Sequence, residues 1–146
     1  MNKVLLKKAT WRDLKEIADI EKEAQSKTYS ALINDVELKN FINKEFVFLI
    51  KRQNIVLGLI AYKIVKKNVV YLDGLVVRKK FRREGVAKRA VNIVLKRVSK
   101  YSRIELLVHP NNNPALCLYL PLGFFIESWK DNYFGDGEPR LMLVKK

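Results

Sequence analysis

Apolar residues recur along the chain with two periods, and the two periods predict two kinds of element. Segments rich in β-branched and aromatic residues predict seven strands, at 4–8, 46–51, 55–64, 71–77, 103–108, 124–129 and 140–144. Apolar residues at spacings of three and four predict four helices, at 10–24, 35–42, 86–98 and 114–122. The predicted order is β-α-α-β-β-β-α-β-α-β-β, a mixed α/β (α+β) arrangement in a single domain over residues 1–146.

Short polar signals support the boundaries of these elements. Thr10 and Asp13 have the spacing of a capping box at the start of the first helix. Asn34 or Asp35 can cap the second helix. Pro114 suits the first turn of the last helix, because no backbone N–H is needed there. The boundary signals therefore agree with the hydrophobic pattern.

Composition excludes several classes of protein. Of the 146 residues, 49% are hydrophobic, and the mean hydropathy is −0.13, as in a globular domain with one core. The sequence has no apolar run long enough for a membrane span and no signal-peptide core, so we expect a cytoplasmic protein. The single Cys117 cannot form an internal disulfide, and we expect it to fill a small space in the core. One cysteine and one histidine also disfavour a metal site.

The charge of the chain is strongly positive. Lys and Arg number 29 against 15 Asp and Glu, which gives a formal net charge of +14. Such a charge attracts phosphorylated ligands, and it leaves RNA or the ribosome open as a partner. Most of the basic residues are spread along the chain, as on a solvated surface. The exception is a basic cluster of five residues in six positions: Arg78, Lys79, Lys80, Arg82 and Arg83.

The basic cluster lies between a predicted strand and a predicted helix. Gly85 follows it and opens the helix, whose first N–H groups have no partner within the helix and lie at the positive end of its dipole. A glycine there lets an anion approach the backbone, and arginines add donors for phosphate oxygens. The stretch 72–87 is therefore a candidate pyrophosphate site, with a solvated basic turn as the alternative. It lacks the second glycine of a Walker loop or a dinucleotide fingerprint.

Two motifs in order along the chain resemble the GNAT superfamily of N-acetyltransferases. Residues 82–87, RREGVA, are similar to the family's acetyl-CoA loop, Arg/Gln-x-x-Gly-x-Gly/Ala. Residues 112–124, NNPALCLYLPLGF, are similar to the family segment N-x-x-A-x-x-L-Y-x-x-x-G-F. The resemblance covers essentially the whole chain. It implies a single central mixed sheet of about seven strands and four helices, with splayed fourth and fifth strands and the pantetheine arm of acetyl-CoA in the splay.

The resemblance also implies which residues hold acetyl-CoA. Backbone groups of Leu75, Val76 and Val77 would pair with the pantetheine amides like an added strand, and one of their N–H groups would polarise the acetyl carbonyl. Asn112 would bond to the pantetheine arm, with a plain helix cap as the alternative. The motif arginine is Arg82. The residues expected around the pyrophosphate through their backbone are Arg83, Glu84, Gly85, Val86, Ala87 and Lys88, and the side chains of Lys79, Lys80 and Arg83 are candidates for the remaining phosphates.

Transfer of an acetyl group to an amine needs a proton donor and a proton acceptor. In many family members a tyrosine protonates the departing thiolate, and Tyr119 fills that position; the alternative is a core tyrosine. The base is open. The similar ribosomal-protein acetyltransferases place a glutamate on the fifth strand, where this chain has Leu107. Asp73 is the first choice, and Glu105, His109 or a water chain are the alternatives.

The C-terminal loop bears on the acceptor. Residues 132–138, NYFGDGE, resemble the N-Y-Y…G-E-D segment of N-terminal protein acetyltransferases, with Phe134 in place of the second tyrosine. The resemblance implies that Tyr133 holds the substrate backbone, with Tyr29 opposite, and that the acceptor is a protein or peptide N-terminal amine. Small amines such as polyamines or amino sugars are one alternative, and a non-catalytic module for RNA or the ribosome is another. Monomer and homodimer both stay open.

Overall fold

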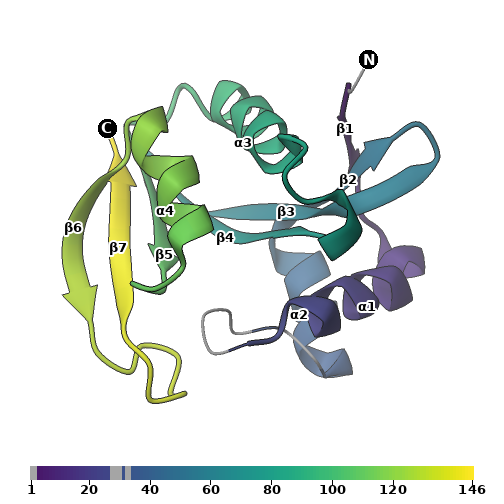
Figure 1. Cartoon of the computed structure of the whole chain (residues 1–146), viewed down its shortest axis with the longest axis horizontal. Coiled ribbons are helices and arrows are strands. Elements are labelled where there is room, and N and C mark those ends of the chain that lie inside the picture. The colour runs from purple at the N-terminus through teal and green to yellow at the C-terminus, as the bar shows by residue number, and fades with distance from the viewer. Residues whose placement is uncertain (1–2, 27–30, 32–33) are drawn as a thin grey trace.

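One sheet forms the centre of the fold and helices cover both of its faces (Figure 1). The computed structural model describes residues 3–26, 31 and 34–146, and within them it contains seven strands and four α-helices. The strands are β1 (Leu5–Lys8), β2 (Phe46–Arg52), β3 (Ile55–Lys66), β4 (Val69–Val77), β5 (Arg103–Val108), β6 (Phe125–Lys130) and β7 (Arg140–Lys145). The helices are α1 (Leu14–Ala24), α2 (Asp35–Lys44), α3 (Val86–Arg97) and α4 (Asn113–Tyr119). The predicted order and fold class are confirmed.

Short 3-10 turns account for the largest differences from the predicted helices. Thr10 and Asp13 form the expected capping box, but it caps a 3-10 turn, Trp11–Asp13, and α1 begins only at Leu14. The last helix also ends early, in a 3-10 turn at Leu120–Leu122. Pro121 lies in that turn and has no N–H to continue the α-helical pattern.

The strand order in the sheet is β1-β2-β3-β4-β5-β7-β6. All neighbouring strands are antiparallel except β4 and β5, which are parallel. Their pairing extends only from Val69 opposite Arg103 to Leu72 opposite Leu106. Beyond Leu72, β4 runs on to Val77 while β5 diverges from it. The sheet is therefore open along this edge of β4.

An irregularity in β4 lies where the opening begins. Tyr62 pairs with Leu72 and Ala61 pairs with Gly74, so the residue between them, Asp73, has no opposite partner on β3. Such a bulge bends a strand and changes the direction of a side chain. Asp73 thus lies at the point where β4 and β5 part.

Successive residues of β2 and β3 alternate between two hydrophobic cores, because side chains in a strand point to opposite faces. One core packs beneath α3 and α4 and contains Phe48, Ile50, Ile60, Val91 and Tyr119 among others. The other packs against α1 and α2 and contains Ile17, Leu38, Val47, Leu49 and Leu59. Each fully buried aliphatic side chain contributes roughly 1.5–3 kcal/mol to the free energy of unfolding. The two cores hold the open edge of β4 between helices on both faces.

The helices of the described residues are short. The longest, α3, has 12 residues, whereas a membrane span needs about 20.

Cys117 is exposed, so the expectation that it fills the core is wrong. At 100° per residue, Cys117 points away from the face of α4 that carries Ala115 and Tyr119.

Candidate active site

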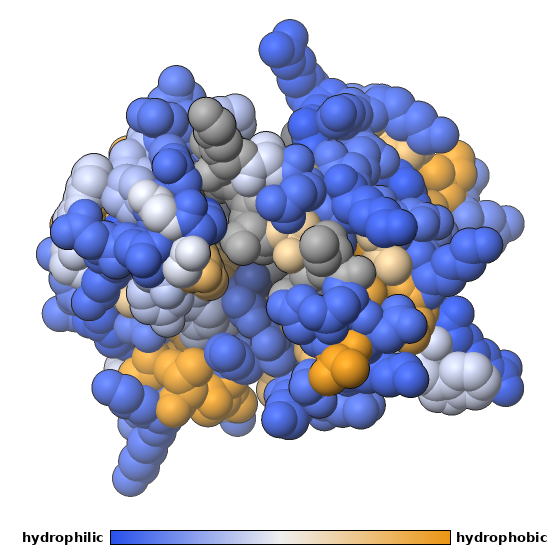
Figure 2. Space-filling model, turned by 90° about the horizontal axis from the view of Figure 1, so that it is seen from below, coloured by the Kyte–Doolittle hydropathy of each residue, from blue (hydrophilic) through white to orange (hydrophobic). Residues whose placement is uncertain are grey.

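The opening beside β4 belongs to a cavity of about 1280 Å³. Residues from α1, α2, β4, the loop before α3, the end of β5, α4 and the loop between β6 and β7 all line it. Figure 2 shows the molecule from below, where the mostly hydrophilic surface is hollowed between its two halves. A site for one drug-sized ligand measures about 300–1,000 Å³. The cavity therefore has room for parts of two substrates at once.

The free edge of β4 forms one wall of the cavity. Leu75, Val76 and Val77 line it, and they pair with β3 on their other side. Across that pairing, a Cβ atom built on Gly58 would lie 2.0 Å from the carbonyl oxygen of Val76. Glycine at position 58 therefore sets the close approach of β3 behind this wall, a feature that the sequence analysis missed. The edge can pair with an extended chain of amides, as the resemblance implied.

The start of α3 forms an amide cradle, made of Gly85 and the backbone N–H groups of Val86, Ala87 and Lys88. Gly85 is the N-cap residue, with a φ of 77° that favours glycine. The backbone N–H of Arg89 donates to Gly85 at 3.1 Å, so the three N–H groups before it precede the first hydrogen bond of the helix. All four cradle residues line the cavity. Their arrangement suits the pyrophosphate of a cofactor.

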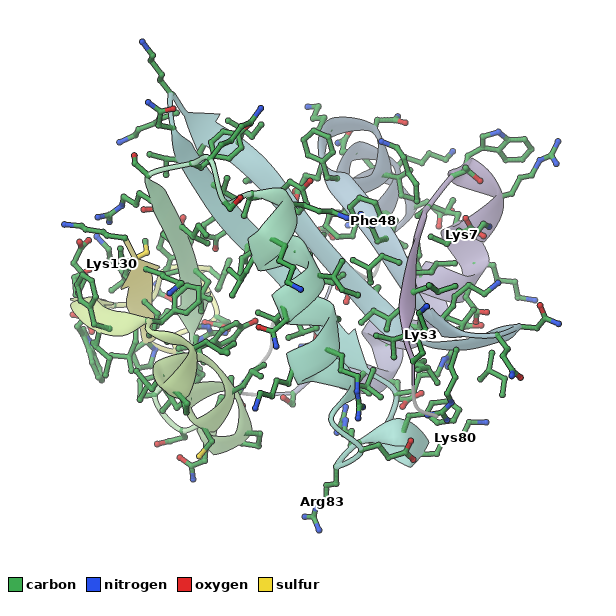
Figure 3. All side chains as sticks on the ribbon, turned by 90° about the horizontal axis from the view of Figure 1, so that it is seen from above. Lys3, Lys7, Phe48, Lys80, Arg83 and Lys130 are labelled. Atoms are coloured by element: carbon green, nitrogen blue, oxygen red, sulfur yellow. The ribbon has the colours of Figure 1, made fainter. Side chains whose placement is uncertain are left out.

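The structure divides the basic cluster between two surfaces. Arg82 and Arg83 line the cavity; Figure 3 shows Arg83 extending outward from the loop before α3. The Arg82 side chain turns back and donates from Nε to the Val77 carbonyl at 2.8 Å, which ties the loop to the end of β4. Lys79 and Lys80 instead line a separate hollow beside α1.

The remaining charges of the loop have partners away from the cavity. Arg78 pairs with Glu16 and Glu23 of α1. The carboxylate of Glu84 pairs with Arg52 at 3.0 Å. Of the positive side chains expected around the phosphates, Arg82 and Arg83 lie on the cavity, while Lys79 and Lys80 do not. Lys88, which was expected to contribute through its backbone, also lines the cavity.

Tyr119 and Asn112 reach the cavity from α4. Tyr119 is buried and packs edge-on against Phe124, with ring centroids 5.3 Å apart. Burial raises the pKa of the Tyr119 hydroxyl, so it stays protonated at neutral pH and can donate a proton. Asn112 caps α4, because its Oδ1 accepts from the backbone N–H of Ala115 at 3.2 Å. Its NH₂ group is the part that could meet the pantetheine arm.

The structure separates the three candidate bases. Asp73 lines the cavity from the bulge in β4, and Lys63 Nζ lies 3.9 Å from its Oδ2. Glu105 is held by Arg103, whose Nε donates to it at 2.9 Å. Leu107, at the position of the expected glutamate, lines the cavity with an apolar side chain. Asp73 is therefore the better placed of the two carboxylates.

His109 uses both ring nitrogens within the protein. Its side chain is 4% exposed, and Nδ1 accepts from the backbone N–H of Asn111 at 3.0 Å. The proton of the neutral ring therefore lies on Nε2, which is 2.7 Å from Oε1 of Glu138. This arrangement leaves no ring nitrogen free to take a proton from an amine. His109 instead ties the end of β5 to the loop between β6 and β7.

That loop, residues 131–139, is called the acceptor loop below. Phe134 lines the cavity, and the exposed ring of Tyr133 packs edge-on against it at 4.9 Å between centroids. Arg140 is buried beneath the loop, 5.1 Å from the centroid of Phe134 and 3.0 Å from Asp136. Tyr29 lies outside the described residues. Ser26 and Ala31, which flank its segment, also line the cavity.

The sequence analysis missed Glu45, which follows α2. Its side chain lines the cavity beside Asp73. Burial, and after it the neighbouring Asp73 carboxylate, raises the pKa of Glu45 to about 9. Oε1 of Glu45 is buried and has no hydrogen-bond partner in the part of the chain that the structure describes. No local signal marks Glu45, because its surroundings come from β3 and β4.

Known proteins resemble this chain in sequence pattern and in fold. The sequence model of the acetyltransferase (GNAT) family matches residues 11–124. The structure of Arabidopsis thaliana Naa50 in complex with the bisubstrate analogue CoA-Ac-MVNAL has 26% identity and a TM-score of 0.82, with 98% of each chain covered. No curated protein matches the chain.

Two further solved structures have the same fold at lower identity. The ribosomal-protein-S18-alanine N-acetyltransferase from Escherichia coli is 17% identical with a TM-score of 0.83, covering 98% of this chain and 93% of that one. Ard1 from Thermoplasma volcanium is 16% identical with a TM-score of 0.85, covering 97% and 96%. The family match spans well over half of the sequence, and the open β4 edge and amide cradle accompany it. The chain belongs to the GNAT family and is an N-acetyltransferase.

Proposed function

We propose that the protein transfers the acetyl group of acetyl-CoA to the N-terminal α-amine of a protein or peptide. The observation that carries the proposal is the continuity of the cavity. It joins the amide cradle and the free edge of β4 to the acceptor loop and the bulge at Asp73. One substrate can enter along β4 and the other from the opposite end, so that they meet near the point where β4 and β5 part.

The cradle and the strand edge divide the binding of acetyl-CoA. The N–H groups of the cradle, with Arg83 and Lys88 nearby, hold the pyrophosphate. Backbone groups from Leu75 to Val77 pair with the pantetheine amides, and one N–H polarises the acetyl carbonyl. The Arg82 side chain supports this geometry through its hydrogen bond to the Val77 carbonyl.

Asp73 and Tyr119 handle the protons. Asp73 takes one proton from the acceptor's ammonium group and passes it to solvent. The neutral amine forms a C–N bond to the carbonyl carbon, and the C–S bond breaks. Tyr119 gives its proton to the leaving thiolate and regains one from the nitrogen, so that the products are an amide, CoA and one released proton.

Charges at the acceptor end of the cavity favour an acceptor with one ammonium group. The acidic side chains there are Glu21, Glu37, Glu45 and Asp73, and the basic ones are Lys44, Lys63 and Arg140. Glu45 keeps its proton at neutral pH, and Arg140 is already paired with Asp136, so the three other acidic side chains face two lysines. This small excess suits one ammonium group, and a polyamine with several charges gains little from it. Two structurally similar proteins point the same way, since one is a ribosomal-protein-S18-alanine N-acetyltransferase and the other is bound to the bisubstrate analogue CoA-Ac-MVNAL.

Mass spectrometry of acetyl transfer tests the proposal. The protein is incubated with acetyl-CoA and a peptide library, with spermidine and free lysine in parallel. We expect acetylation at peptide N-termini. Acetylation of the small amines alone would exclude a peptide acceptor, and salt-sensitive RNA binding without any transfer would favour the non-catalytic module.

A further inference from the structure

An ammonium group of the protein itself already lies at the acceptor end of the cavity. Lys63 Nζ is 3.9 Å from Oδ2 of Asp73 and 5.5 Å from the centroid of the Tyr71 ring. The Lys63 side chain is 41% exposed, so it reaches this position from the surface of β3. A carboxylate and an aromatic face are two features that bind a primary ammonium ion. Lys63 therefore marks a place built for such an ion.

Glu45 completes the surroundings of this place. Lys63 and Asp73 both lie close enough to the Glu45 carboxyl to interact with it electrostatically, and Glu45 in turn lies close enough to interact with the Tyr71 hydroxyl. Since Glu45 is protonated at neutral pH, the carboxyl pair carries the single negative charge of Asp73. Oε1 of Glu45 offers an acceptor that no described residue uses. One ammonium ion therefore satisfies both the charge and the free acceptor.

The location connects this place to the reaction. Asp73 precedes Leu75 by two residues on β4, a rise of about 7 Å along a strand. Lys63, Tyr71, Glu45 and Asp73 line the same cavity as Leu75. An amine bound by Asp73 therefore lies close to the part of the β4 edge that would hold the thioester.

We propose that Asp73, Glu45 and the ring of Tyr71 bind the ammonium group of the acceptor, and that Lys63 occupies this site until the acceptor displaces it. The inference rests on the proposed function, and it adds a resident competitor and two binding residues to it. Lys63 weakens acceptor binding in this account. If Lys63 only neutralises Asp73 for stability, its removal would instead leave acceptor binding unchanged or weaken it.

Steady-state kinetics with Lys63→Met test the competition. The N-terminal peptide is varied at saturating acetyl-CoA, and Lys66→Met, on the same strand but outside the cavity lining, is the control. We expect Lys63→Met to lower the peptide KM by about two- to fivefold, the size of an exposed ion pair, with the KM for acetyl-CoA unchanged. Lys66→Met should match the wild type. An unchanged or raised peptide KM in Lys63→Met would overturn the inference.

Further variants keep the test informative. Asp73→Asn should raise the peptide KM at least tenfold. Adding Lys63→Met to Asp73→Asn should then leave the peptide KM unchanged, because the lysine no longer competes for a carboxylate. Tyr71→Leu removes the aromatic face and should raise the peptide KM by about two- to fivefold, the size of an exposed cation–π contact, and Tyr71→Phe, which keeps the face, should raise it less. An unchanged peptide KM in Tyr71→Leu would contradict the role of the ring face.

Assays of the wild-type protein distinguish a failure of the proposed function from a failure of the proposed ammonium site. If it acetylates spermidine but no peptide, the peptide part of the proposed function fails, and the same KM comparison with spermidine decides the ammonium site. If it acetylates no amine, both are overturned.

Discussion

His109 and Glu138 are joined by a 2.7 Å hydrogen bond, although they are 29 residues apart in the sequence. The other ring nitrogen of His109 accepts from Asn111, in the turn that leads into α4. One buried imidazole thus connects the end of β5, the approach to α4 and the acceptor loop.

Breaking the connection should affect the acceptor more than the cofactor. In His109→Leu we expect the KM for a peptide acceptor to rise by about tenfold, because the partly buried hydrogen bond between the imidazole and the Glu138 carboxylate is lost and the acceptor loop is released. The KM for acetyl-CoA should stay within about twofold. Glu138→Gln, which keeps an oxygen acceptor, should have a smaller effect. A larger loss for acetyl-CoA than for the peptide would contradict this role.

The amide cradle can be tested with two glycines of the same backbone conformation. Gly85 and Gly135 both have a φ of 77°, so the backbone strain of an alanine is similar at either position, about 1–2 kcal/mol. At Gly85 the new Cβ would also lie 3.1 Å from Nη1 of Arg89, the far end of a flexible side chain that can move aside, whereas at Gly135 it would meet no described atom within 4 Å. Only in Gly85→Ala does the new Cβ lie in the cradle. We expect acetyl-CoA to bind Gly85→Ala at least tenfold more weakly and Gly135→Ala as in the wild type. Thermal unfolding against acetyl-CoA concentration measures both affinities.

Equal stabilisation of Gly85→Ala and Gly135→Ala by acetyl-CoA would show that the cradle does not contact the pyrophosphate. The unliganded melting temperatures of the two variants separate the strain from the loss of binding.

Removal of the Tyr119 hydroxyl should slow the reaction without weakening cofactor binding. Because burial keeps this hydroxyl protonated, it can act as an acid, a role worth about 10²–10⁴ in rate. We expect kcat of Tyr119→Phe to fall by about 10²-fold or more. Stabilisation by acetyl-CoA should be retained. Tyr62→Phe, at a buried tyrosine outside the cavity lining, is the control and should keep its kcat.

Glu45 should make the stability of the protein depend on pH. Its pKa is raised from 4.5 to about 9 on folding, so between these values the folded state holds a proton that the unfolded state releases. Stability from this group is full below about pH 4.5 and is lost as the pH rises toward 9. Glu45→Gln removes this pH-dependent loss of stability. The free energy of unfolding of the variant, relative to wild type, should therefore rise by on the order of 1–2 kcal/mol between pH 5 and pH 9, allowing for solvent screening.

Denaturant unfolding at pH 5, 7 and 9 measures this difference. Glu37→Gln, on the neighbouring helix α2 and also lining the cavity, controls for the loss of a carboxyl group. A constant difference between Glu45→Gln and wild type over this range would show that Glu45 is ionised at neutral pH.

Local interactions made much of the fold predictable. The two periods of apolar residues, the capping box at Thr10 and the glycine before α3 act over a few residues, and the structure contains each of them. The expectation for Cys117 failed, because its exposure depends on how α4 rotates against the sheet. The roles of Lys79 and Lys80 also depend on packing, since α1 draws that part of the loop away from the cavity.

By itself, the sequence determined the order of the elements, the site of the cradle and the family resemblance, since these follow from spacing along the chain. Only the tertiary structure decided which ionisable groups meet. Glu45 acquires its raised pKa because β4 brings Asp73 beside it, and His109 acquires its fixed proton because two loops converge on it. Burial and distance in space set both properties, and neither can be read from neighbouring residues in the sequence.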